Sequence, residues 1–143
     1  MRFDSRGAAA VEMAFVVVLL LWLVLGVVDV GRVILTRLAL EDAVHAGVAH
    51  AAFTPDADAA SVEAVTIGST DSITLTGAEI QVACMEVTRE PKPASRVRVE
   101  VVHTVDYLTP LVGPALGGSI DLHETAEAER FAESCDGLEE VPW

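Results

Sequence analysis

The sequence predicts an α+β protein in which a long N-terminal transmembrane helix continues into a small exported domain with an antiparallel β-sheet. Residues 8–28 are almost all apolar, the chain after Thr54 is polar and acidic, and two later segments alternate apolar and polar side chains as strands do. We expect three parts: a cytoplasmic leader over residues 1–7, the transmembrane helix and its extension over residues 8–53, and an exported acidic, β-rich domain over residues 54–143.

Residues 8–28 are long enough to cross a membrane. They contain one charged residue, Glu12, and a helix of this stretch reaches roughly 31 Å, about the thickness of the hydrocarbon core. Arg2 and Arg6 precede the stretch, and the arginines that follow it are accompanied by acidic residues. By the positive-inside rule we expect the N-terminus in the cytoplasm and the C-terminal domain outside.

The small residues at the N-terminus precede the apolar stretch instead of following it. A secretory signal has its small-residue cleavage site after the apolar stretch, where this chain offers only a poor site. A protease on the cytoplasmic face would reach the junction between Gly7 and Ala8, and cleavage there would leave the apolar helix as the mature N-terminus. We therefore predict that Gly7 and Ala8 flank a peptidase cleavage site.

Glu12 is the residue for which we predict a role in assembly. An ionised carboxylate near the start of a membrane helix costs about 2 to 3 kcal/mol unless it is compensated. Cleavage after Gly7 would create an α-amino group on Ala8, one helical turn away, and neighbouring helices could then pair amino group and carboxylate across subunits. The alternative is that Glu12 lies in the interfacial zone, solvated or favoured by the helix N-terminus.

The helical pattern continues to about Phe53, where Thr54 and Pro55 end it. Arg37 and Glu41 are four residues apart and can pair on one face. Small residues are frequent, which fits either close helix packing in a membrane or the helix propensity of alanine: Gly31, Ala39, Ala43, Ala46, Gly47 and Ala49. A projection at 100° per residue gives no clean apolar stripe, so the sequence assigns no partner face to this segment.

The part after the helix contains a linker and strands. Residues 56–71 are interpreted as linker and loop, and residues 79–88 as a strand. The connection over residues 89–95 contains two prolines and cannot join a ladder. Residues 96–107 give the clearest strand pattern, and together with residues 79–88 they predict an antiparallel pair with one buried face.

Alternation in the clearest strand defines its two faces. One face carries Val97, Val99, Val101, His103, Val105 and Tyr107, and the other carries Arg96, Arg98, Glu100, Thr104 and Asp106. Residues 108–118 contain two prolines and three glycines and predict an irregular loop. Residues 119–131 fit either a strand or a helix; we favour a strand that returns beside residues 96–107.

Two cysteines, Cys84 and Cys135, follow the apolar stretch, and the chain has no third. In an exported domain this number predicts one disulfide, which would connect the strand at residues 79–88 to the C-terminal tail. The alternative is a buried free Cys84 with an exposed Cys135.

No residue pattern indicates a catalytic, cofactor or metal site. His45 and His50 are five residues apart and do not have the spacing of metal ligands on one helix face, and no nucleophile or phosphate-binding motif is present. The acidic balance, a net charge of −13, opposes binding of nucleic acid. We expect a protein that is not an enzyme and has no cofactor.

The N-terminal sequence resembles that of a known family. The run from Arg6 to Phe15, RGAAAVEMAF, followed by an apolar span and then Gly31-Arg32, closely resembles the opening of TadE-like proteins, pseudopilins of tight-adherence (Flp-type) pili. The family often has an aromatic residue after the glutamate, where this chain has Met13. It also often has a proline in the span, and the absence of one here predicts a straighter helix.

The resemblance implies a pilin-like fold and a minor pseudopilin that acts in the assembly of tight-adherence type IV pili. It implies processing after Gly7 by a prepilin peptidase, and it matches Glu12 to the recognition and assembly glutamate of the family. The expected partners are the membrane, the prepilin peptidase, other pilin or pseudopilin subunits and the pilus assembly platform. The alternative is an unprocessed, single-pass surface or binding module outside any filament.

Overall fold

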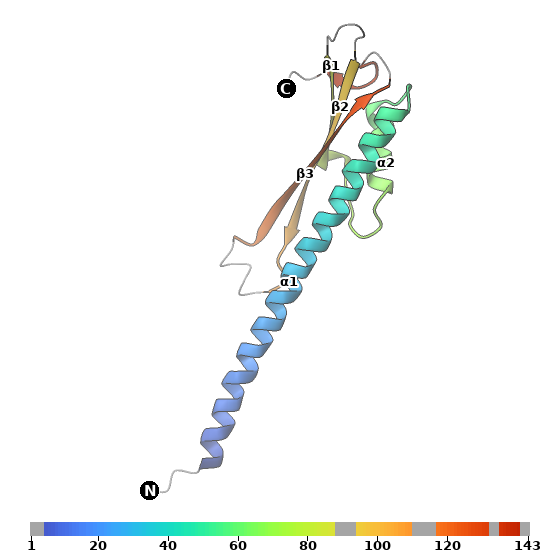
Figure 1. Cartoon of the computed structure of the whole chain (residues 1–143). Coiled ribbons are helices and arrows are strands. Elements are labelled where there is room, and N and C mark those ends of the chain that lie inside the picture. Colours follow the sequence, from blue (N-terminus) through green and yellow to red (C-terminus); the bar gives the residue numbers. More distant parts are fainter. Residues whose placement is uncertain (1–4, 88–93, 110–116, 132–134, 141–143) are drawn as a thin grey trace.

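The computed structural model describes residues 5–87, 94–109, 117–131 and 135–140. A long helix with a small domain at its C-terminal half dominates the molecule (Figure 1). The elements follow in this order: α1 (Ser5–Phe53), α2 (Ala59–Gly68), a short 3-10 helix (Gly77–Glu79), β1 (Ile80–Val87), β2 (Ala94–Asp106), β3 (Ser119–Arg130) and β4 (Glu139–Glu140).

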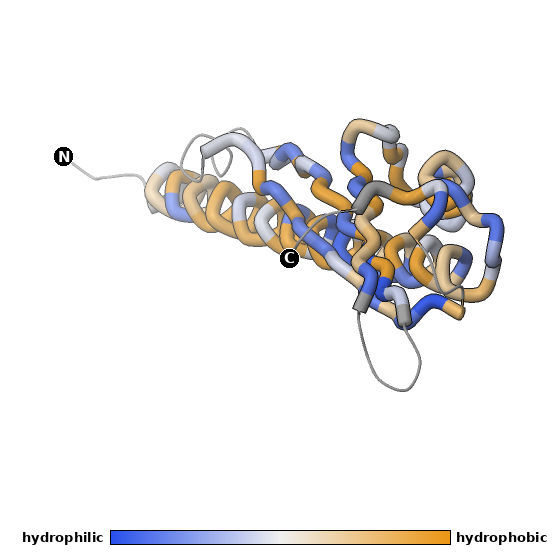
Figure 2. Tube along the Cα trace, turned by 90° about the horizontal axis from the view of Figure 1, so that it is seen from above, coloured by the Kyte–Doolittle hydropathy of each residue, from blue (hydrophilic) through white to orange (hydrophobic). Residues whose placement is uncertain are grey.

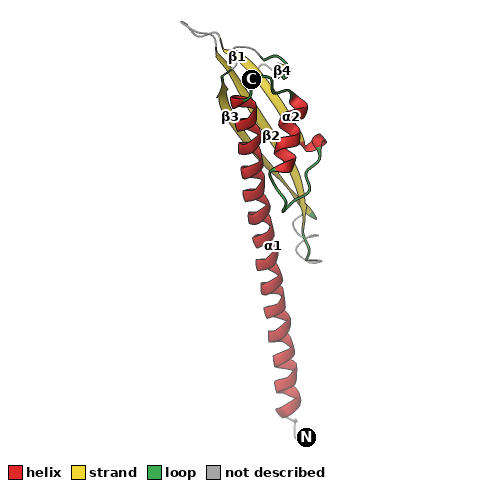
Figure 3. Cartoon of the chain, turned by 90° about the vertical axis from the view of Figure 1, so that its right-hand side faces the viewer, coloured by secondary structure: helices red, strands yellow, loops and turns green. Residues whose placement is uncertain are grey.

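Helix α1 is one uninterrupted α-helix of 49 residues. It has no proline, so nothing removes a backbone hydrogen bond or kinks it, and it runs nearly straight from the N-terminus into the domain (Figure 3). The predicted end at Phe53 is confirmed. Thr54 still donates its N–H to the carbonyl of His50 at 3.0 Å, and Pro55 cannot continue the helix.

The sheet has the strand order β3-β2-β1-β4. Strand β2 is antiparallel to both β1 and β3, and β4 runs parallel to β1. The predicted antiparallel pairing of β1 with β2 is therefore confirmed, with Thr88 outside the described residues. The prediction that residues 89–95 cannot join the ladder is wrong at its end, because Ala94 and Ser95 pair with Val87 and Glu86. The ambiguous segment, residues 119–131, forms strand β3 beside β2, as favoured from the sequence.

Strand β2 lies along α1 (Figure 3), and its apolar face is buried. Val97, Val99 and Val101 have no exposed surface, and the polar residues between them lie on the other face of the sheet. Helix α1 presents a defined face to this sheet, which the sequence projection did not reveal. Its buried residues follow a helical spacing of three and four: Leu40, Ala43, Val44, Gly47, Val48, Ala51 and Ala52. The stripe was missed because small residues make up half of it.

The prediction of linker and loop over residues 56–71 is wrong, because Ala59–Gly68 form helix α2. Asp58 caps the helix by accepting the N–H of Ser61 at 2.9 Å, and the Ser61 hydroxyl in turn accepts the N–H of Asp58 at 3.1 Å. Val62 and Thr66 are buried. A ten-residue helix with four β-branched residues is marginal alone, so packing against α1 stabilises it.

Gly47 permits the close approach of α2 to α1. A Cβ atom at this position would lie 2.1 Å from the Thr66 hydroxyl oxygen, which is far inside van der Waals contact. Of the small residues in this segment, Ala43 and Gly47 are buried within the domain itself. Arg37, which we expected to pair with Glu41, instead forms an ion pair with Glu124 of β3 at 2.7 Å.

These elements form an α+β, pilin-like arrangement: a long apolar N-terminal helix packed against a small three-stranded antiparallel sheet. The domain covers only the C-terminal half of α1. The N-terminal half projects away from it (Figure 1), and this division positions the residues described next.

Candidate functional site

The projecting half of α1 is apolar and has no partner within the described chain. All residues from Gly7 to Leu25 are exposed, and the helix contains an 18-residue window of mean hydropathy 2.8 of which none is buried. Figure 2 shows this half as an almost continuous hydrophobic rod. Soluble monomers rarely expose an apolar patch of this size, and the helix is long and apolar enough to cross a membrane.

The structure places the three predicted N-terminal site residues on this exposed half. Gly7 and Ala8 lie in the first turns of α1, and no atom lies within 4 Å of the position of a Cβ at Gly7. Glu12 follows Ala8 by four residues, so both lie on one face of the helix. Glu12 is exposed and forms no ion pair with any side chain that the structure describes. This face is therefore free to contact another molecule.

Asp29, which the sequence did not single out, connects the helix to the domain directly after the apolar stretch. Its side chain accepts the N–H of Leu108 at 3.0 Å and the N–H of Thr109 at 3.2 Å. The Thr109 hydroxyl donates a third hydrogen bond to it at 2.5 Å. Asp29 is only 3% exposed. We call Asp29, Leu108 and Thr109 the Asp29 clasp.

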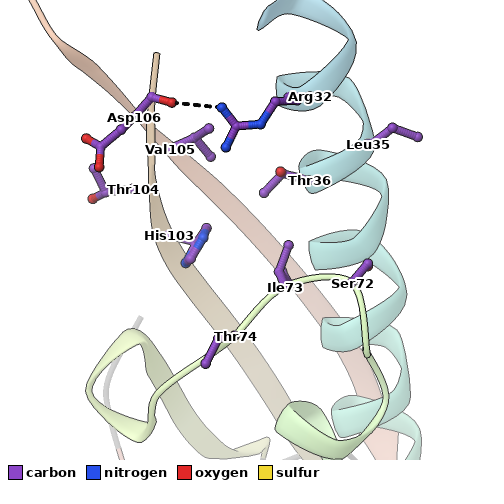
Figure 4. Close-up of a pocket in the computed structure, with 10 residues that line it drawn as sticks. All are labelled: Arg32, Leu35, Thr36, Ser72, Ile73, Thr74, His103, Thr104, Val105 and Asp106. Carbon is purple, nitrogen blue, oxygen red and sulfur yellow. Dashed lines mark hydrogen bonds between the residues drawn. The ribbon is translucent and has the colours of Figure 1, made fainter. Parts of the chain in front are cut away.

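A second contact lies almost one turn further along α1. Arg32 donates a hydrogen bond to the backbone carbonyl of Asp106 at 3.3 Å, the last residue of β2 (Figure 4). Arg32 and Asp106 also line an open cavity of about 560 Å³ between α1 and β2. Hydroxyl side chains from three elements line the same cavity, among them Thr36, Ser72 and Thr104.

His103, on the predicted inner face of β2, lines this cavity and pairs with Glu79. The His103 Nδ1 atom lies 2.6 Å from a carboxylate oxygen of Glu79. Thr76 donates its N–H and its hydroxyl to the other oxygen, both at 2.7 Å. Burial alone would raise the pKa of Glu79, but the hydrogen bonds from Thr76 and His103 outweigh it and hold the pKa below its ordinary value. The pair is a structural contact between β2 and the 3-10 helix.

Cys84 and Cys135 form a disulfide, with Cα atoms 5.7 Å apart. Both residues are buried in the core. The predicted pairing is confirmed, and the bond connects β1 to the segment that leads to β4. Within the described residues, no group of three or more His, Cys, Asp or Glu side chains is placed to hold a metal ion.

Comparison with known proteins gives one family. Residues 7–49 match the model of the TadE-like protein family. The match covers the exposed half of α1 together with most of the part that packs against the sheet, and it ends before α2. No curated protein and no solved structure matches the chain.

Proposed function

We propose that this chain, a TadE-like protein over its N-terminal helix, is a minor pseudopilin in the assembly of tight-adherence type IV pili. One observation carries the proposal. The N-terminal half of α1 is a long, exposed apolar helix. The C-terminal half is packed into the core of the folded domain. An exposed apolar helix joined to a domain with its own hydrophobic core is the arrangement expected of a subunit that packs with other subunits through that helix.

Processing after Gly7 is part of the proposal. The Gly7–Ala8 junction lies three residues from the described start of α1 and is exposed. The first turn of a helix lacks intrahelical acceptors for its N–H groups and frays readily, so a prepilin peptidase needs to unwind little to reach this bond. The new N-terminus at Ala8 would carry an ammonium group in place of the leader.

Glu12 would then pair with the N-terminus of a neighbouring subunit. Ala8 and Glu12 lie on one exposed face of α1. In a low-dielectric environment an isolated carboxylate is costly, and an ammonium partner on the adjacent helix compensates that cost. The pairing sets the axial register of two helices that have otherwise uniform apolar surfaces.

The domain is exported in this proposal, with the N-terminus in the cytoplasm. The disulfide between Cys84 and Cys135 supports this orientation, since disulfides persist in oxidising compartments outside the cytoplasm. The acidic composition of the domain is compatible with a solvated surface on a pilus or on an assembly platform.

The N-terminus of protein recovered from membranes tests the proposal. The full chain is expressed with and without a prepilin peptidase, and its N-terminus is sequenced. We expect a chain that begins at Ala8 only when the peptidase is present, and a Gly7→Leu variant that stays uncleaved. If the wild-type chain keeps its leader in the presence of an active peptidase that cleaves a control prepilin, the remaining function is that of an unprocessed, membrane-anchored surface module.

A further inference from the structure

We propose that Leu108, held by the Asp29 clasp, is a lipid-contact site that inserts into the outer leaflet of the membrane beside α1. The exported domain would then contact the membrane directly, in addition to its connection through α1. This inference rests on the proposed function, because it requires that the apolar half of α1 spans the membrane.

The position of the clasp along α1 sets the depth of Leu108. The apolar stretch ends at Val28, and Asp29 is the first charged residue after Glu12. If residues 8–28 fill the hydrocarbon core of roughly 30 Å, Asp29 lies at its outer boundary. Because the Leu108 N–H donates directly to the Asp29 carboxylate, the Leu108 backbone lies at the same boundary.

The clasp holds this backbone firmly. Three hydrogen bonds converge on the Asp29 carboxylate, one from Leu108 and two from Thr109. Hydrogen bonds to a charged acceptor are among the stronger ones in proteins. The contact also solves a problem for the helix, since a carboxylate at the edge of the hydrocarbon needs polar partners. Asp29 finds them in its own chain and is 3% exposed.

Arg32 would lie at the level of the lipid headgroups. It lies about 4.5 Å further along α1 than Asp29, is itself exposed, and contacts the carbonyl of Asp106. Arginine side chains at this level commonly reach toward headgroup phosphates while their stems stay on apolar surface. Figure 4 shows the contact of Arg32 with Asp106, the last residue of β2. The end of β2 and the residues after it are therefore bound to α1 at two successive levels, by Arg32 and by Asp29.

Leu108 offers the apolar contact at this depth. Its side chain is 64% exposed although its backbone is held by Asp29. A single exposed leucine is ordinary on a surface far from a membrane. This one is fixed at the membrane boundary, where burial of an apolar side chain in lipid is favourable. In the sequence, no charged residue follows Leu108 up to Gly118.

Tryptophan fluorescence with depth-dependent quenching tests the site. The full chain is reconstituted into phosphatidylcholine vesicles that contain lipids brominated at a shallow position on the acyl chain. Leu108→Trp is made in a background that carries Trp22→Phe and Trp143→Phe. We expect its emission to shift to shorter wavelength and to lose intensity to the brominated lipids. Adding Asp29→Ala to this variant should reverse most of both effects.

Two matched probes complete the design. Phe131→Trp in the same background reports on a residue that is 75% exposed at the far end of the domain, and it should show neither the shift nor the quenching. Native Trp22, with Trp143→Phe alone, reports insertion of α1 itself. If Trp22 is quenched but Leu108→Trp behaves like Phe131→Trp, the lipid-contact site is refuted and the membrane helix stands. The same holds if the emission of Leu108→Trp shifts to shorter wavelength without quenching, which would mean that a second copy of the chain covers this residue. If Trp22 is not quenched, the proposed function fails as well.

Discussion

Asp29 and Thr109 are 80 residues apart in the sequence, yet Thr109 donates both its N–H and its hydroxyl to one oxygen of the Asp29 carboxylate. The contact joins the helix at the end of its apolar stretch to the turn that follows β2. The ion pair between Arg37 and Glu124 joins α1 to the middle of β3. The domain and the helix are thereby one rigid unit at the level where the helix leaves the apolar stretch.

Thr109→Val tests how much this contact stabilises the domain. The substitution keeps the shape of the side chain but removes the hydroxyl donor, leaving the buried Asp29 with two backbone donors. We expect the free energy of unfolding to fall by about 1 to 3 kcal/mol, measured by urea unfolding of the full chain in detergent. Thr125→Val, on an exposed position of β3, is the control and should change the free energy by less than about 0.5 kcal/mol. Equal effects of the two variants would contradict the assigned role of the clasp.

Gly47→Ala tests the close packing of α1 against α2. The new methyl group would overlap the Thr66 hydroxyl, which is buried and donates to the carbonyl of Val62. We expect the melting temperature to fall, because overpacking of this kind costs about 1 to 3 kcal/mol and exceeds the gain in helix propensity of about 1 kcal/mol.

The matched control for this variant is Gly31→Ala in the same helix. A Cβ at Gly31 has no atom within 4 Å, so only the gain in helix propensity applies and the melting temperature should stay the same or rise. A Gly47→Ala variant as stable as Gly31→Ala would mean that α2 does not pack on α1 as closely as described.

The Glu79 contacts predict a loss of stability in acid. The folded chain holds the pKa of Glu79 below its ordinary value of 4.5. In the window between the two values the unfolded chain binds the proton more readily, so the free energy of unfolding decreases as the pH falls through it. The contribution is fully present above pH 4.5 and is lost once the pH is below the pKa of the folded state.

Glu79→Gln should therefore flatten the pH dependence of stability below about pH 5, measured from urea unfolding at a series of pH values. Glu41→Gln changes an exposed carboxylate on α1 that makes no hydrogen bond within the described structure and is the control. A Glu79→Gln variant with the same slope as the wild-type chain would show that the contacts with Thr76 and His103 are not maintained in solution.

The elements that could be predicted carry their signal within a short stretch of sequence. Alternation of valine with charged residues from Val97 to Val101 predicts a half-buried strand whatever lies beside it, and an unbroken apolar run predicts a membrane helix. Helix α2 has no such signal. Its β-branched residues disfavour a helix in isolation. Close packing against α1 stabilises it, and this packing is possible because Gly47 of α1 has no side chain.

The candidate site divides in the same way. Gly7, Ala8 and Glu12 form a local motif and could be proposed from the sequence. Asp29 could not, because an acid after an apolar stretch is most simply read as the point where the chain returns to water. The structure shows instead a buried carboxylate with donors from Leu108 and Thr109, just after β2, a long-range contact that no local pattern contains.

Glu12→Gln tests the proposed pairing between subunits. The amide keeps the size of the side chain and its ability to lie at the membrane, but it removes the negative charge that an ammonium group at Ala8 of a neighbour would compensate. We expect membrane insertion and cleavage after Gly7 to persist while incorporation into pilus assemblies falls at least about tenfold, which corresponds to the loss of about 1.4 kcal/mol of pairing free energy. The measurement is the amount of this chain that co-purifies with sheared pili or with the assembly platform. Glu41→Gln, on the domain half of α1, is the matched control and should assemble normally. Normal assembly of Glu12→Gln would contradict the pairing, because the pairing needs the negative charge. Glu12 would then be assigned to the solvated interfacial zone of the membrane.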